Sequence, residues 1–182
     1  PTVTGQLLVN PIAVGGMHTC DVATGTVRCG GNNTSGQLGD GLQEAVSTKL
    51  GTAAGISKAV GVRAGAQHTC AVLADASLEC WGNNSAGQLG DGTSTSRSTP
   101  VVLANLPPLA VNSLPTKSLL APGSEHTCAI AEGGDVYCWG ANLLGQLGNG
   151  STTPSLVPLK VTGLPLPAIS ICSGGLHVCA PP

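Results

Sequence analysis

One segment recurs along this chain of 182 residues, and this internal repeat constrains the fold more than any other feature. Three copies align, each with an HTC triplet near its start and GQLG near its end, at 15–41, 65–92 and 123–150, and a partial copy occupies 174–182. The period is 50 residues from Cys20 to Cys70 and 58 residues from Cys70 to Cys128. The extra length falls in the proline-bearing stretch 104–117, which we interpret as a loop insertion.

Within each repeat the residue order indicates short strands joined by turns. In the second copy HTCAVL and LECW read as strands around the turn ADAS, and TPVVLANL at 99–106 adds an extended segment. Glycine occurs 27 times and proline 13 times, which disfavours helices. About four short strands in about 50 residues is the size of one propeller blade.

Charge and hydropathy exclude two classes of partner. The seven basic and nine acidic residues give a net charge of −2 without clusters of either sign, so no basic face is expected for nucleic acid. The longest apolar stretches, such as LPPLAV at 106–111, are too short and too proline-rich to cross a bilayer. We therefore predict no nucleic-acid partner and no membrane span.

The even number of cysteines, eight, favours disulfides, with metal ligation and a redox role as alternatives. Three pairs have the spacing of directly opposed residues across a hairpin, and the single-residue deletion in the first repeat falls in its turn ATGT. These pairs are Cys20 with Cys29, Cys70 with Cys80, and Cys128 with Cys138. For Cys172 and Cys179 we expect an intrachain bond across the GGLH turn, with an intersubunit bond as the alternative.

The recurring polar residues are interpreted as architecture. Equivalent residues spread around a ring cannot converge on one metal ion, so each histidine is expected to be partly buried and bonded to nearby backbone, at His18, His68, His126 and His177. Turn stabilisation is expected of Asp40, Asp91 and Asn149. No metal, cofactor or small-molecule substrate is inferred. No catalytic constellation occurs in the sequence, so we predict a non-enzymatic protein; a hydrolase or lyase on a propeller face is the unsupported alternative.

The succession AG-x-x-HTCA, CWG-x-N-x-x-GQLG-D/N-G and a T-P-V segment resembles the repeats of the regulator of chromosome condensation family, in its cysteine-containing form from secreted bacterial proteins. The resemblance implies an all-β propeller, with about three complete four-stranded blades and partial blades at both ends of a single array, 1–182. A ring of about seven such blades needs about 350 residues. The resemblance therefore implies a fragment of a longer propeller, two copies closing a ring, or a head-to-tail assembly.

The function predicted from these features is that of an extracytoplasmic binding or structural module. It would contact a protein partner or further copies of itself, through its incomplete terminal blades and through the loops 42–58 and 104–117. The alternatives are an inhibitor-like role and a guanine-nucleotide-exchange-like role, both carried out by binding a protein.

Overall fold

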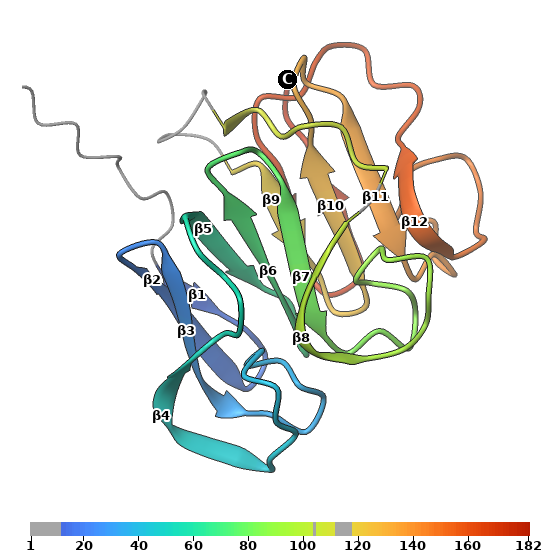
Figure 1. Cartoon of the computed structure of the whole chain (residues 1–182). Coiled ribbons are helices and arrows are strands. Elements are labelled where there is room, and N and C mark those ends of the chain that lie inside the picture. The colour runs from blue at the N-terminus through green and yellow to red at the C-terminus, as the bar shows by residue number, and fades with distance from the viewer. Residues whose placement is uncertain (1–11, 104, 112–117) are drawn as a thin grey trace, which may run out of the picture.

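The computed structural model describes residues 12–103, 105–111 and 118–182, and its regular elements are strands (Figure 1). Three four-stranded antiparallel sheets are followed by a two-stranded hairpin. The first sheet contains β1 (Ile12–Val14), β2 (His18–Ala23), β3 (Thr26–Asn32) and β4 (Val46–Thr52). The second contains β5 (Ala59–Ala64), β6 (His68–Leu73), β7 (Leu78–Gly82) and β8 (Arg97–Val102). The third contains β9 (Leu120–Pro122), β10 (His126–Ile130), β11 (Val136–Gly140) and β12 (Ser155–Lys160). The hairpin pairs β13 (Cys172–Ser173) with β14 (Val178–Cys179).

Each sheet is a meander in which strands adjacent in sequence are adjacent in space. The sheets lie side by side in chain order (Figure 1), so each is one blade of a propeller. The predicted all-β fold of four-stranded blades is confirmed. The hairpin β13–β14 is the start of a fourth blade, whereas the partial blade predicted at the N-terminal end falls in 1–11, outside the described residues.

The second and third strands of each blade form a hairpin with the register that the cysteine spacing predicts. The facing pairs are Cys20 and Cys29, Cys70 and Cys80, and Cys128 and Cys138. In the first hairpin the turn consists of Thr24 (φ 50°) and Gly25 (φ 80°), both left-handed, as a two-residue hairpin turn requires. The missing residue of the first repeat is therefore absorbed by the turn, and the facing register survives.

The structure contains four disulfide bonds, and each joins two strands of one blade. In the three complete blades the bonded Cα atoms are 4.1 Å apart. In the fourth, Cys172 and Cys179 are 5.2 Å apart at their Cα atoms. All eight cysteines are thus used in pairs within the chain.

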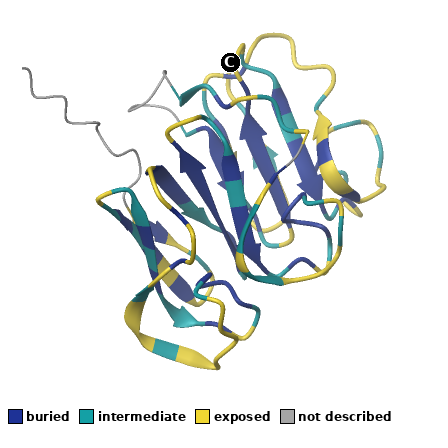
Figure 2. Cartoon of the chain, in the orientation of Figure 1, coloured by how far each residue is buried: buried dark blue, intermediate teal, exposed yellow. Residues whose placement is uncertain are grey.

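The hydrophobic cores lie between neighbouring blades. Between the first and second blades, Val27 and Leu38 pack with Val62 and Trp81. The other two cores follow the same pattern, with Trp139 in the second and Ile171 in the third. Buried residues concentrate on strands such as β6 and β10, while the outer strand β4 is largely exposed (Figure 2). The cores consist mainly of small aliphatic side chains, with one indole in each of the first two.

The two stretches predicted as contact loops are more structured than expected. Most of 42–58 is the outer strand β4 with its flanking turns. In the described part of the insertion, 105–111, Leu109 is buried and pairs with Ala131 of the third blade. Residues 104 and 112–117 lie outside the described residues. Across the described ranges, no helix has the length and apolar character needed to span a membrane.

Candidate functional site

The loop after the third strand of each blade is tied together by one buried asparagine. Its Oδ1 atom accepts a hydrogen bond from the backbone N–H five residues on, in the pairs Asn33–Leu38, Asn84–Leu89 and Asn142–Leu147. Its Nδ2 atom donates to the residue that the sequence predicts as turn-stabilising, namely Asp40, Asp91 or Asn149. Each blade thus presents a loop of fixed shape toward the next blade.

The second blade covers the loop of the first with an indole and a hydroxyl group. The carbonyl oxygen of Gln37 accepts hydrogen bonds from Trp81 Nε1 at 2.9 Å and from Thr69 Oγ1 at 2.8 Å. A Cβ atom built on Gly39 would lie 2.6 Å from Trp81 Nε1, so only glycine permits this approach. The second interface repeats the arrangement, with Gln88 accepting from Trp139 and Thr127 above Gly90.

Two of the recurring histidines, His18 and His68, link neighbouring blades through their side chains rather than binding backbone of their own blade. His18 Nε2 lies 2.8 Å from Thr69 Oγ1, and His68 Nε2 lies 2.9 Å from Thr127 Oγ1. Because each threonine hydroxyl already donates to a glutamine carbonyl, the imidazole Nε2–H is the donor. Burial lowers the pKa of His18 to about 4 and that of His68 to about 3. These imidazoles are therefore neutral near pH 7, and the predicted backbone partner was wrong.

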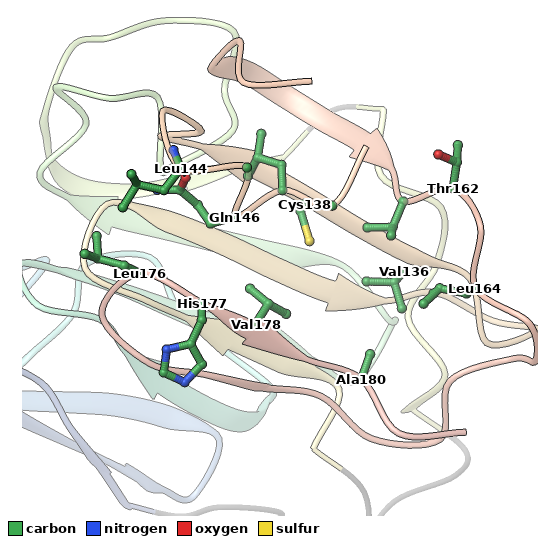
Figure 3. Close-up of a pocket in the computed structure, with 14 residues that line it drawn as sticks. Val136, Cys138, Leu144, Gln146, Thr162, Leu164, Leu176, His177, Val178 and Ala180 are labelled. Atoms are coloured by element: carbon green, nitrogen blue, oxygen red, sulfur yellow. Dashed lines mark hydrogen bonds between the residues drawn. The ribbon is translucent and has the colours of Figure 1, made fainter. Parts of the chain in front are cut away.

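The third blade presents the same loop without an indole above it in the described part of the chain. A Cβ atom built on Gly148 would meet a side chain only at 3.3 Å, at Val161. A hollow of about 410 Å³ opens here, with Leu144 and Leu176 in its wall (Figure 3). Leu147 also lines it. Among the described residues, no group donates to the carbonyl of Gln146, the equivalent of Gln37.

The fourth repeat departs from the histidine–threonine pattern. Val178 stands where the second and third blades have Thr69 and Thr127, so His126 meets no hydroxyl group, and neither ring nitrogen of His126 has a hydrogen-bond partner among the described residues. Burial lowers the pKa of His126. His177 is exposed, which corrects the prediction that all four histidines are partly buried.

Two adjacent leucines distinguish the third loop from the other two. Leu143 and Leu144 occupy positions held by Thr34 and Ser35 in the first repeat and by Ser85 and Ala86 in the second. Leu143 is 76% exposed and Leu144 68% exposed. Thr34 and Ser85 are also exposed although a neighbouring blade is present, so exposure at the Leu143 position is a property of the loop. We call the exposed leucines Leu143, Leu144 and Leu176, together with the adjacent hollow, the third-blade face.

In the part of the chain that the structure describes, no three His, Cys, Asp or Glu side chains gather as a metal site would require. Asp91, a turn residue of the type that can ligate calcium, forms an ion pair with Arg97 at 2.8 Å instead. The side chains that define the third-blade face, Leu143, Leu144 and Leu176, are apolar.

The repeat profile described as Regulator of chromosome condensation (RCC1) repeat matches residues 80–130 and 133–180, and a second profile of the same description matches 59–88. The chain belongs to the RCC1 repeat family. Ultraviolet-B receptor UVR8 of Arabidopsis thaliana is 35% identical over 170 residues, covering 92% of this chain and 37% of the receptor. The E3 ubiquitin-protein ligase HERC2 of Homo sapiens is 31% identical over 157 residues, covering 85% of this chain and 3% of the ligase.

Solved structures of the same fold are also similar to this RCC1-repeat chain. Prp20p from Saccharomyces cerevisiae superposes with a TM-score of 0.81 at 24% identity, covering 95% of this chain and 43% of Prp20p. Yeast RCC1 bound to Kap60 gives a TM-score of 0.79 at 24% identity, covering 94% of this chain and 41% of that chain. The chain thus spans little more than a third of the length of UVR8 and under half of these yeast structures. These relatives are plant, mammalian and yeast proteins, so the predicted bacterial and secreted origin remains a prediction.

Sequence reasoning identified the repeated residues but missed their partners. The threonine after each histidine, the tryptophan after the second cysteine and the glutamine of GQLG meet across blade boundaries. The sequence does contain a hint of these contacts. The threonine is replaced by Val178 in the fourth repeat, and the tryptophan is replaced by Gly30 in the first, so only the terminal repeats depart from the pattern.

Proposed function

We propose that this chain is a protein-binding propeller module without catalytic activity of its own. In this proposal the third-blade face receives two paired β-strands of a partner protein, one of which carries a tryptophan side chain. The observation that carries the proposal is the pair of exposed leucines, Leu143 and Leu144, in a loop whose other copies have small or polar residues at these positions. Exposed apolar patches on a rigid scaffold mark interaction surfaces.

The two internal blade interfaces support the choice of occupant. At both of them a tryptophan lies over the loop glycine, and its Nε1–H donates to the glutamine carbonyl. The loop also donates a backbone hydrogen bond to the outer strand of the following blade. At the first interface Gly41 N–H donates to the Ser98 carbonyl, and at the second Gly92 N–H donates to the Leu156 carbonyl. An incoming strand pair with a tryptophan would make the same contacts to Gly148 and Gly150. Main-chain pairing supplies affinity in this mode, and the side-chain pocket supplies specificity.

The relatives are consistent with a protein-binding role. The yeast RCC1 structure contains bound Kap60, and the Prp20p structure was reported together with the binding properties of Prp20p to Gsp1p and histones. For this chain a partner of that kind is part of the proposal. The four disulfide bonds support the further proposal that the chain works in an oxidising compartment.

The experiment uses a fluorescent peptide with the sequence of residues 135–160 carrying Cys138→Ser, because this segment contains Trp139 and an outer strand. Fluorescence anisotropy should report saturable binding to the whole chain. The double variant Leu144→Ser, Leu176→Ser should weaken binding at least about tenfold, because it removes apolar contacts near the indole. Both leucines are more than half exposed, so their replacement leaves the core intact.

Two controls make the result specific. Leu50→Ser, at a 52% exposed position on β4, should bind the peptide as the unaltered chain does, and a peptide carrying Trp139→Ala should bind more weakly. Equal binding by the Leu144/Leu176 variant would refute the proposed face.

Light scattering on the chain alone distinguishes a separate partner from a second copy. We expect a monomer of 17.8 kDa, because the first blade has Gly30 in place of the tryptophan and cannot supply an indole. A stable dimer that the Leu144/Leu176 variant abolishes would instead favour the self-assembly predicted from the sequence.

A further inference from the structure

Arg63 is an arginine without a carboxylate partner. The chain has three arginines, of which Arg28 pairs with Asp21 and Arg97 pairs with Asp91. All nine acidic residues lie within the described ranges, and none of them forms an ion pair with Arg63. The charge of Arg63 is therefore not balanced by a neighbouring carboxylate.

The guanidinium of Arg63 is only partly solvated. Arg63 lies on β5, the first strand of the second blade, is half-buried, and burial lowers its pKa. Its Nη2 atom donates to Ser118 Oγ at 2.9 Å, beside β9 of the third blade. A guanidinium carries five N–H donors, and described groups accept only this one. A partly buried charge with free donors is unfavourable unless an anion or water meets it.

The free donors of Arg63 border a hollow of about 380 Å³ that three blades build together. β5 provides Arg63, the chain around β9 provides Ser118 and Leu120, and the segment entering β13 provides Ser170 and Ile171. The hollow thus combines one cation and hydroxyl groups with an apolar wall. Its volume lies in the range typical of small-ligand sites, about 300–1,000 Å³.

We propose that this hollow binds a small oxyanion, a carboxylate or a phosphate monoester, through the guanidinium of Arg63 and the hydroxyl groups of Ser118 and Ser170. The planar fork of arginine matches two oxygens of a carboxylate or phosphate. Serine hydroxyls can donate to the remaining oxygens.

The site is independent of the third-blade face. The Arg63 hollow lies at β5, β9 and the segment entering β13, whereas the third-blade face combines the loop after β11 with Leu176 of the β13–β14 turn, and the two hollows share no lining residue. A ligand here would bridge the second, third and fourth blades and would stabilise their packing by mass action.

The test follows the side-chain Nε–Hε signals of the ¹⁵N-labelled chain by NMR, since three arginines give three resolvable signals. Inorganic phosphate and acetate are titrated separately at constant ionic strength, with chloride as the reference. We expect one arginine signal, assigned to Arg63 by its loss in Arg63→Gln, to shift saturably with phosphate, acetate or both. The anion that shifts it identifies the oxyanion class.

Matched variants complete the test. Arg63→Lys should weaken binding about tenfold because it loses the bidentate fork, and Ser118→Ala should weaken it less. Arg28→Gln, which alters an arginine of the first blade, should leave the titration unchanged. Equal shifts of all three arginine signals, or no saturation with either anion, would overturn the proposal. Failure of the peptide experiment above would leave this result unaffected.

Discussion

At the scale of single residues, the histidine–threonine contacts join one blade to the next. Thr69 accepts a hydrogen bond from His18 and donates one to the carbonyl of Gln37, and all three residues are buried. Replacing Thr69 with valine keeps the shape but leaves the His18 Nε2–H donor unsatisfied, and the Gln37 carbonyl keeps only its hydrogen bond from Trp81. The contact therefore contributes more through avoided desolvation than through the net strength of its hydrogen bonds.

We predict that Thr69→Val lowers the free energy of unfolding by about 1–3 kcal/mol. Urea denaturation measures the difference. Thr19→Val is the matched control, because Thr19 occupies the same repeat position but is exposed, and it should change stability by less than about 0.5 kcal/mol. Equal effects of the two variants would show that the interblade contact contributes nothing.

The buried histidines also make the stability of the folded chain depend on pH. The pKa values of His18 and His68 fall from 6.5 to about 4 and about 3 in the folded chain, so protons bind preferentially to the unfolded chain. The stability that comes from keeping His18 neutral is fully present above pH 6.5 and is lost as the pH falls toward 4. The lowered pKa of Asp91 acts only below its ordinary value of 3.8, outside this window.

We therefore predict that the free energy of unfolding decreases from pH 6.5 to pH 4, and that His18→Gln makes this decrease shallower. Chemical denaturation at several pH values gives the slope. An unchanged slope in the variant would contradict a neutral, buried His18.

At the scale of the secondary-structure elements, each blade depends on a disulfide across its central hairpin. Cys70 and Cys80 lie on β6 and β7, at directly opposed positions with Cα atoms 4.1 Å apart. The bond closes a short loop in the unfolded chain, and the chain-entropy estimate for such a loop is about 2–3 kcal/mol. The narrow interblade cores, with few aromatic side chains, make this contribution a large fraction of total stability.

We predict that the double variant Cys70→Ala, Cys80→Ala loses about 2–3 kcal/mol of unfolding free energy. The pair Cys172→Ala, Cys179→Ala should affect stability less, because both cysteines are exposed in the terminal hairpin. Denaturation without reductant compares the two variants. A larger loss at the terminal hairpin would contradict this ranking.

The elements were largely predictable from the sequence, because hairpin register is a local property. The spacing from Cys20 to Cys29 and the turn at Gly25 determine the facing pairs within a dozen residues of chain. The interblade contacts were not predictable in the same way. His18 and Thr69 are separated by 51 positions, and their proximity depends on how two sheets pack. Arg63 has no counterpart in the other repeats, and its hollow is assembled from three blades, so the sequence pattern did not single it out.

At the scale of the whole molecule, the blades form a series in which the loop of one blade is covered by the blade that follows. The first two loops receive Trp81 and Trp139, and the third presents Leu143 and Leu144 beside an apolar hollow. The central claim is that this third-blade face binds a tryptophan-bearing strand of a partner protein in the manner of the internal interfaces. The claim predicts which backbone groups become hydrogen-bonded on binding.

The most direct test is a ¹H–¹⁵N NMR titration of the labelled chain with the 135–160 peptide carrying Cys138→Ser. Gly41 and Gly92 donate to the following blade at 2.9 and 3.0 Å, whereas the amide of Gly150 has no acceptor among the described residues. We predict that the Gly148 and Gly150 amide signals shift and that the Gly150 amide becomes protected from exchange, while the Gly148 amide keeps its existing bond to Gly145 and the signals of Gly41 and Gly92 stay unchanged. Binding that shifts signals of the first blade and leaves Gly148 and Gly150 unmoved would contradict it.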